Sequence, residues 1–372
     1  MIHDRYWFPF MGLFIFSLLA ACETQEVRSS TSPAPLLKRE RRPAEQPTLR
    51  TLALRRGIRI GVAVAVKPLR EDPLYAQTIR EEFNAVTPEN AMKWDAIRPT
   101  RERFDFADAD AIVDFATAND MLVRGHTLIW HGQNPDWLKK GAFSDEELRA
   151  ILREHIMTVV GRYRGRVAVW DVVNEAIDED EPSLLRKSLW LRRLGPDYLA
   201  MAFRWAHEAD PQARLFYNDT GGEGLGKQSD AIYQVLQKLV ENGVPVHGVG
   251  LQMHVGMHDV PNLGDVTANM TRLAALGLEI HITEMDVQIQ KGTGVAQYDY
   301  ASQSVIYQTV TTACLRMSAC KALVVWGLTD SLSWIPMWTK HADSPLLFDG
   351  DYNRKPAYYG IRKALQQHNG QG

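Results

Sequence analysis

The sequence predicts an α/β protein, and within that class a single (β/α)8 TIM barrel. Three observations indicate this fold. Short apolar runs recur along the chain, helical patterns separate them, and polar residues follow the runs at their carboxyl ends. The chain has 372 residues, 45% of them hydrophobic and 23% charged, which is enough to build one large packed domain.

Eight apolar runs are expected to form the barrel strands. Runs of this length, bounded by turn residues, are typical of strands buried on both faces of a parallel sheet. They occupy residues 59–65, 83–89, 121–130, 168–176, 214–219, 247–254, 278–287 and 322–330.

Helical patterns lie between these runs. The clearest are at 108–118, 145–163, 196–209 and 227–242. The second begins after Ser144, with Glu147 three residues later, which is the spacing of a capping box. The main alternative fold, a doubly wound open sheet, needs a glycine-rich first βα turn. The first run continues as "GVAVAVKPL", which does not supply one.

The amino-terminal residues are expected to lie outside this domain. Residues 1–21 have the pattern of a lipoprotein-type signal peptide, which ends in "LAAC", so that Cys22 would carry the lipid. An ordinary signal peptide is the alternative. Residues 22–48 are rich in proline and polar side chains and are expected to form a flexible linker to a folded domain at 49–367. We therefore expect export to the cell envelope, at the outer membrane or cell surface, or else secretion.

The charge and the aromatic content limit the possible partners. A net charge of −3 gives no electrostatic case for binding nucleic acid, and we expect a monomer. The ten Trp and twelve Tyr residues offer flat faces that suit stacking on sugar rings, although most such residues in any protein belong to the core.

Polar side chains follow nearly every predicted strand. Because barrel active sites form at the carboxyl ends of the strands, these residues predict a functional rim. They are Glu89, Asn90, His126, Asn174, Glu175, Asn218, Asp219, Gln252, His254, Glu284 and Asp286, together with Trp326.

Two carboxylates on this rim suggest a reaction. Glu175 follows the fourth run and Glu284 the seventh, and these strands face each other across the mouth of an eight-stranded barrel. A carboxylate pair across a Trp-lined pocket indicates glycoside hydrolysis, in which one carboxyl protonates the leaving oxygen and the other attacks the sugar or activates water. The alternative is that each is an ion-pair partner at a strand end.

The neighbours of the two carboxylates support the same chemistry. Asn174 could bind the sugar 2-hydroxyl, a contact that strengthens in the transition state. His254 could bond Glu284, with Asp286 orienting its ring, so that Glu284 stays ionised and correctly aimed. The alternative for His254 is a core histidine bonded to a backbone carbonyl.

Five short motifs of the sequence together resemble one protein family. "ENAMKW", "RGHTLIWH", "WDVVNEA", "ITEMDV" and "WGLTDSLSW" occur in the order found in glycoside hydrolase family 10, the retaining endo-β-1,4-xylanases. The resemblance covers about residues 58–365. It implies a substrate of xylan and xylo-oligosaccharides, and no cofactor or metal.

The resemblance also implies roles for individual residues. Glu175 matches the acid/base and Glu284 the nucleophile. The matches around the sugar at the cleavage point are Asn174, His126, Trp130, Gln252 and His254, and those around the next sugar are Glu89, Asn90 and Lys93. Trp326 and Trp334 match aromatic walls of the cleft. Gln133 and Trp334 match bulky side chains that exclude the hydroxymethyl group of a hexose.

Two cysteines remain, Cys314 and Cys320. In an exported protein such an isolated pair favours a disulfide, with two separate buried thiols as the alternative. The resemblance also implies this bridge.

The sequence departs from the family pattern in three places. Thr220 stands where a tyrosine often lines the cleft, Met253 replaces a serine, and residues 335–343 have an unfamiliar sequence that adds Trp338. These differences bear on subsite preference and not on the carboxylates.

Other functions remain to be weighed. One is an enzyme of the same fold acting on another β-1,4-glycan, such as a glucan, and another is a non-catalytic glycan-binding lipoprotein. "GGEGLGK" at 221–227 resembles a phosphate-binding loop but is followed by Gln228 instead of Ser or Thr. "HVGMH" at 254–258 lacks the glutamate of a zinc helix.

Overall fold

The computed structural model describes residues 46–289 and 296–367. The predicted signal peptide, Cys22 and all but the end of the predicted linker lie outside the described residues. Within the described part of the chain, no helix is long and apolar enough to cross a membrane.

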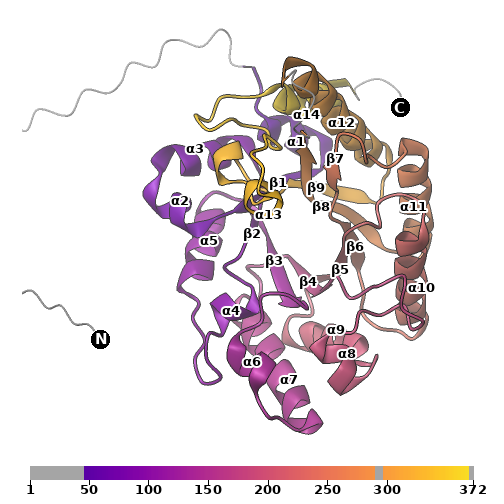
Figure 1. Cartoon of the computed structure of the whole chain (residues 1–372). Helices are drawn as coiled ribbons and strands as arrows, with labels where there is room; N and C mark the ends of the chain where they lie inside the picture. Colours follow the sequence, from indigo (N-terminus) through magenta and orange to yellow (C-terminus); the bar gives the residue numbers. More distant parts are fainter. Residues whose placement is uncertain (1–45, 290–295, 368–372) are drawn as a thin grey trace, which may run out of the picture. The chain divides into compact units, whose positions relative to one another are not determined.

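Eight parallel strands form a closed ring (Figure 1), so the predicted (β/α)8 barrel is confirmed. Each strand pairs with its neighbour, and the ring closes where the eighth barrel strand pairs with the first and the sixth with the seventh. The barrel strands are β1 (Arg59–Val64), β2 (Ala85–Pro88), β3 (Leu122–Ile129), β4 (Val169–Asn174), β5 (Arg214–Asp219), β6 (Gly248–Leu251), β8 (Glu279–Gln288) and β9 (Cys320–Val325).

The sixth predicted strand is shorter than expected, and this is a correction to the sequence analysis. β6 ends at Leu251, and Met253 has a backbone φ of +65°, which interrupts an extended strand. The chain then forms β7 (His254–Gly256), which pairs with β8 alone and sets His254 opposite Asp286. The break therefore places His254 beside the carboxyl-terminal part of β8.

Helices connect the strands and surround the ring (Figure 1). The longer ones are α1 (Leu49–Arg56), α3 (Pro73–Glu82), α5 (Ala107–Ala118), α7 (Asp145–Arg162), α9 (Tyr198–Ala209), α10 (Lys227–Glu241), α11 (Leu263–Ala275), α12 (Ala296–Arg316) and α14 (Pro356–Gln367). The shorter ones are α2 (Val66–Glu71), α4 (Trp94–Ile97), α6 (Asp136–Lys140), α8 (Leu189–Leu194), α13 (Ile335–Thr339) and a 3-10 turn at Asp330–Leu332.

The four predicted helices agree with α5, α7, α9 and α10 to within two residues at either end. The capping box before α7 is present. The Glu147 amide donates to the Ser144 hydroxyl at 3.1 Å, and the Ser144 amide donates to the Glu147 carboxylate at 2.8 Å. These two bonds satisfy amide groups that a helix start leaves unpaired.

Glycines in the barrel strands make room for large rings on both faces of the barrel wall. A Cβ atom on Gly125 would collide with the ring of Trp170, and one on Gly248 with that of Phe216. Both rings are fully buried, so the strands must carry glycine opposite them. The result is a barrel wall packed on its inner and outer faces, which supports the rim side chains.

A disulfide joins Cys314 in α12 to Cys320 at the start of β9, with a Cα–Cα distance of 5.2 Å. The predicted bridge is confirmed. It ties a surrounding helix to the barrel strand that follows it.

Candidate active site

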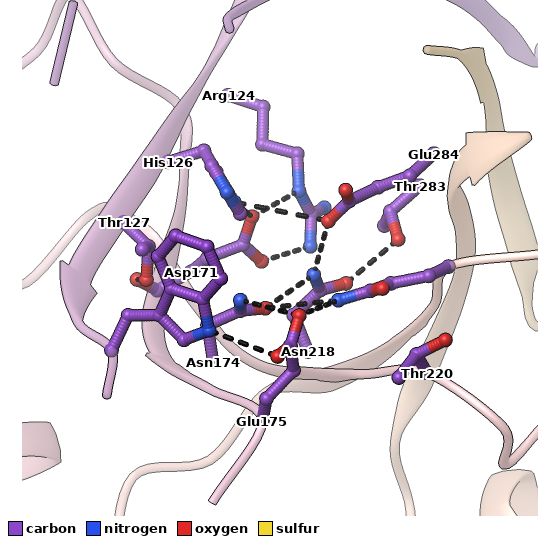
Figure 2. Close-up of polar contacts among 12 residues, drawn as sticks. Arg124, His126, Thr127, Asp171, Asn174, Glu175, Asn218, Thr220, Thr283 and Glu284 are labelled. Atoms are coloured by element: carbon purple, nitrogen blue, oxygen red, sulfur yellow. Dashed lines mark hydrogen bonds and ion pairs between the residues drawn. The ribbon is translucent and has the colours of Figure 1, made fainter. Parts of the chain in front are cut away.

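The carboxyl ends of the strands bring the two predicted carboxylates to one cluster (Figure 2). Glu175 directly follows β4, and Glu284 lies within β8. Asn174 and Asn218 lie between them. Asn218 donates to Asn174 Oδ1 at 2.8 Å and to Glu284 Oε1 at 2.6 Å. The carboxylates are thus connected through amide side chains and share no direct contact.

The side chain of Glu175 receives three hydrogen bonds. Trp130 Nε1 donates to Oε2 at 2.9 Å, Gln252 Nε2 to Oε1 at 3.0 Å and Asn174 Nδ2 to Oε1 at 3.2 Å. Its carboxylate is also the more accessible of the pair, since its side chain is 17% exposed and that of Glu284 5%. Glu175 can therefore meet a substrate from the open side of the site.

The backbone of Glu175 is held as firmly as its side chain. Its φ of +52° lies in the left-handed region, which costs free energy for a residue other than glycine. The Glu175 amide donates to the Asn218 carbonyl at 2.9 Å, and Arg186 Nε donates to the Glu175 carbonyl at 3.0 Å. The next amide, of Ala176, donates to the Tyr217 hydroxyl at 3.1 Å. We call these three contacts the main-chain clamp.

Glu284 is buried between two histidines. His254 Nε2 lies 3.3 Å from its Oε2, and His126 Nδ1 lies 4.0 Å from its Oε1. Burial opposes ionisation, but the charge of His126 and the hydrogen bond and charge of His254 outweigh it and hold the pKa of Glu284 below its ordinary value. Glu284 is thus an ionised carboxylate across the neutral pH range.

His254 is itself kept protonated. Its Nδ1 lies 2.9 Å from Asp286 Oδ2, which also accepts from Trp334 Nε1 at 2.8 Å. Burial would lower the pKa of His254, but Asp286 and then Glu284 raise it to about 10. Both ring nitrogens then carry protons and donate to the two carboxylates. The structure thus contains the contacts of His254 with Glu284 and with Asp286 that the sequence suggested.

A second group of predicted residues lies beside this pair. Lys93 Nζ donates to Asn90 Oδ1 at 3.0 Å, Gln133 Nε2 approaches the same oxygen at 3.4 Å, and Lys93 lies 5.0 Å from the centre of the Trp130 ring. Burial lowers the pKa of Lys93, while Glu284 and Glu89 oppose that change. Burial likewise raises the pKa of Glu89, against the charge of Lys93. This group can offer hydrogen bonds to sugar hydroxyls.

Two tryptophans complete the cluster. The Trp326 ring meets His126 edge-on at 5.2 Å and His254 at 6.2 Å, and the Trp334 ring meets His254 at 5.1 Å. Every residue predicted for the carbohydrate site therefore belongs to one connected group of contacts.

The sequence analysis missed a buried charge network beneath the site. Arg124 donates to both oxygens of Asp171, through Nε at 2.9 Å and through a second, shorter bond, and His126 Nδ1 donates to Asp171 at 3.0 Å. Burial would raise the pKa of Asp171, but the Arg124 charge and His126 lower it. Asp171 therefore accepts a hydrogen bond from the His126 Nδ1–H group, which fixes the imidazole ring beside Glu284.

Three further residues near the carboxylates had no predicted role. Asn218 was expected on the rim but not as the bridge between Asn174 and Glu284. Thr283 orients it by donating to Asn218 Oδ1 at 2.7 Å. His131 Nδ1 lies 3.8 Å from Glu175 Oε2, and burial lowers the pKa of His131 against the Glu175 charge. The one available signal was that these residues fall inside or beside the motifs.

Replacing His254 by asparagine tests the support of Glu284. Without the His254 charge and donor, the pKa of Glu284 rises. Protonation then removes the nucleophile at a higher pH, and the acid limb of the kcat/KM profile moves upward. Loss of alignment lowers kcat/KM by about 10²-fold at the optimum. The exposed His258, replaced in the same way, is the control. An acid limb that stays in place in His254→Asn would contradict the assignment.

No group of three or more His, Cys, Asp or Glu side chains suited to hold a metal ion occurs in the described ranges 46–289 and 296–367. Glu175 and Glu284, with the donors around them, are the reactive side chains that this site brings together. A barrel rim with two carboxylates held apart by amides and flanked by tryptophans defines a glycoside hydrolase.

Comparisons with known proteins place the chain within that class. Residues 48–364 match the model of glycosyl hydrolase family 10, and the chain belongs to this family. It is 42% identical over 321 residues to endo-1,4-beta-xylanase B of Thermotoga neapolitana, across 86% of this chain and 92% of that protein.

Solved structures agree in fold. Native xylanase 10B of Thermotoga maritima has a TM-score of 0.83 and 43% identity, covering 86% of this chain and 98% of that one. Xylanase 10B of Thermotoga petrophila, solved in complex with xylobiose, has a TM-score of 0.83 and 42% identity, covering 87% and 98%.

Proposed function

We propose that the protein is a retaining endo-1,4-β-xylanase, which hydrolyses internal β-1,4-xylosidic bonds by double displacement. The observation that carries this proposal is the contrast between the two carboxylates. Glu284 is buried and kept ionised by His126 and His254, whereas Glu175 is the more accessible and lies across the amide bridge. This is the pairing of a nucleophile with an acid/base.

In the first step, Glu284 attacks the anomeric carbon while Glu175 gives its proton to the departing oxygen. A glycosyl-enzyme ester forms on Glu284, and the leaving chain departs as an alcohol. In the second step, Glu175 takes a proton from water, which attacks the ester and releases the sugar with its original configuration. Asn174, which Asn218 and Gln252 orient, is placed to bind the 2-hydroxyl during both steps.

Substrate choice is assigned to the group around Asn90. Gln133 has a left-handed backbone, with φ of +42°, and its Nε2 donates to Asn90 Oδ1 at 3.4 Å. Together with Trp334 it can form the wall that rejects a hexose hydroxymethyl group while admitting xylose. Glu89, Asn90 and Lys93 bind the adjoining sugar, and Trp326 packs beneath the reacting one.

The proposal is tested by ¹H NMR of xylohexaose hydrolysis, using protein that lacks residues 1–47. The initial product is expected to be the β-anomer, which then relaxes to the α/β mixture. An initial α-anomer would mean inversion and a wrong nucleophile. Turnover of a soluble β-1,4-glucan without turnover of xylohexaose would keep the carboxylate roles and overturn the substrate. Binding of oligosaccharide without any turnover would favour a glycan-capturing protein.

We further propose that the protein acts as a monomer and is exported as a lipoprotein. Its signal peptide would be removed before Cys22, and residues 22–48 would tether the catalytic domain at 49–367. The support is the sequence pattern alone: an apolar stretch ending in "LAAC", then a proline-rich segment. Partition of the full chain into detergent, lost in Cys22→Ser, tests the anchor, and equal partition of both would refute it. Sedimentation of the catalytic domain tests the monomer.

A further inference from the structure

The short helix α13, labelled in Figure 1, follows Trp334. It carries exposed apolar side chains. Trp338 is 77% exposed and Met337 74%, whereas Ile335 in the same helix is fully buried. Tryptophan is rarely left so open, because its large apolar surface is favourable to cover. An exposed aromatic residue beside a functional cleft therefore indicates a binding surface.

Local contacts hold Trp338 in this exposed position. Pro336 stands in the first turn of the helix, where its fixed φ suits the helix start. The Trp338 amide donates to the Trp334 carbonyl at 3.1 Å, and the Thr339 hydroxyl donates to the Ile335 carbonyl at 2.9 Å. The buried Ile335 anchors the helix to the domain. Trp338 is thus presented by an ordered element.

The exposed ring continues the aromatic lining of the active site. The centres of the Trp338 and Trp334 rings are 6.1 Å apart, with an angle of 51° between their planes. Trp334 in turn donates to Asp286 and packs against His254, the residue that supports Glu284. An aromatic surface therefore extends from His254, which contacts Glu284, through Trp334 to Trp338.

We propose that Trp338, with Met337 beside it, is an additional sugar-stacking site that extends the cleft for long xylan chains. This inference rests on the proposed function. A xylan chain is the occupant that fits, because the surface is continuous with the substrate cleft through Trp334. Xylose rings have apolar faces and no charge, so a flat aromatic ring can bind them where ion pairs cannot. The site contributes to binding a polymer and takes no part in bond cleavage.

The test is the dependence of kcat/KM on substrate length in Trp338→Ala. An aryl β-xylobioside is the short substrate and xylohexaose the long one. We expect the ratio of kcat/KM for xylohexaose to that for the xylobioside to fall roughly 3- to 10-fold, the effect of losing one aromatic contact. Trp338→Phe keeps a flat ring and should restore most of the ratio. Val305→Ala, which changes an exposed apolar residue on α12, is the control and should leave the ratio unchanged.

Two outcomes would overturn the inference: a ratio that stays unchanged in Trp338→Ala, even if the activity on both substrates falls equally, or no recovery of the ratio in Trp338→Phe. An equal loss would mean that Trp338 supports the fold of the rim and does not contact the chain. These results differ from failure of the proposed function, in which the unmodified protein would hydrolyse neither substrate.

Discussion

Glu284→Ala is expected to abolish turnover on every substrate, whatever its leaving group. The glycosyl-enzyme ester cannot form without this carboxylate, and in the part of the chain that the structure describes no other carboxylate contacts both His126 and His254. Loss of a nucleophile of this kind costs roughly 10⁵-fold or more in kcat. The measurement is the steady-state rate on aryl xylobiosides with good and poor leaving groups.

A loss of activity in this variant must be separated from a loss of fold. Glu284→Gln keeps an oxygen that can accept from Asn218 and should be folded and equally inactive, as judged by thermal unfolding. Glu241→Ala, which removes an exposed carboxylate at the end of α10, should retain full activity. Added azide can replace the missing nucleophile, and the product would then be the α-glycosyl azide. Substantial hydrolysis by Glu284→Ala without azide would exclude Glu284 as the nucleophile.

Glu175→Ala is expected to separate the two steps of the reaction. With a dinitrophenyl leaving group no proton is needed, so glycosylation of Glu284 should proceed at close to the normal rate. With a poor leaving group it should slow by about 10²- to 10⁴-fold, the usual contribution of a general acid. Hydrolysis of the glycosyl-enzyme ester should be slow with either substrate, because the variant has no general base to deprotonate water. A burst of dinitrophenol followed by a slow steady state is the expected signature.

Azide provides an independent check on Glu175. It needs no deprotonation to attack, so it should accelerate turnover of the variant and give the β-glycosyl azide. Equal losses on good and poor leaving groups, or no response to azide, would refute the acid/base role. Trp130→Phe is the matched control, since it removes a donor to Glu175 while leaving the carboxyl in place, and it should show no burst.

The sequence predicted the barrel because burial on both faces leaves a clear pattern. Strands such as Arg214–Asp219 coincide with the predicted run, and the helix beginning after Ser144 starts where its capping residues indicate. The break between β6 and β7 escaped prediction. It depends on a positive φ at Met253, and methionine gives no signal for that conformation.

The candidate site was predicted unevenly, for a similar reason. The residues that would touch a substrate stand at strand ends, where polar side chains in apolar surroundings are conspicuous. Asp171 and Arg124 lie inside strands, and their pairing depends on which positions of β3 and β4 face each other. Asn218 was visible as a rim residue, but its bridging role depends on a neighbour 66 positions away. Such contacts depend on the register between neighbouring strands, and a single sequence does not reveal that register.

The main-chain clamp around Glu175 has a consequence for redesign. The main chain at Glu175 is held by contacts with Asn218, Arg186 and Tyr217. The contacts of Trp130 and Gln252 with Glu175 reach only its carboxylate. One set of contacts thus positions the backbone of the proton donor, and a separate pair of side chains contacts its carboxyl group. A library of variants at Trp130 and Gln252 can be screened for activity on substrates with new leaving groups. The backbone of Glu175 keeps its position in such variants, because its clamp contacts are unchanged. Shortening Glu175 to aspartate draws the carboxyl back by one methylene, because the clamped backbone does not follow.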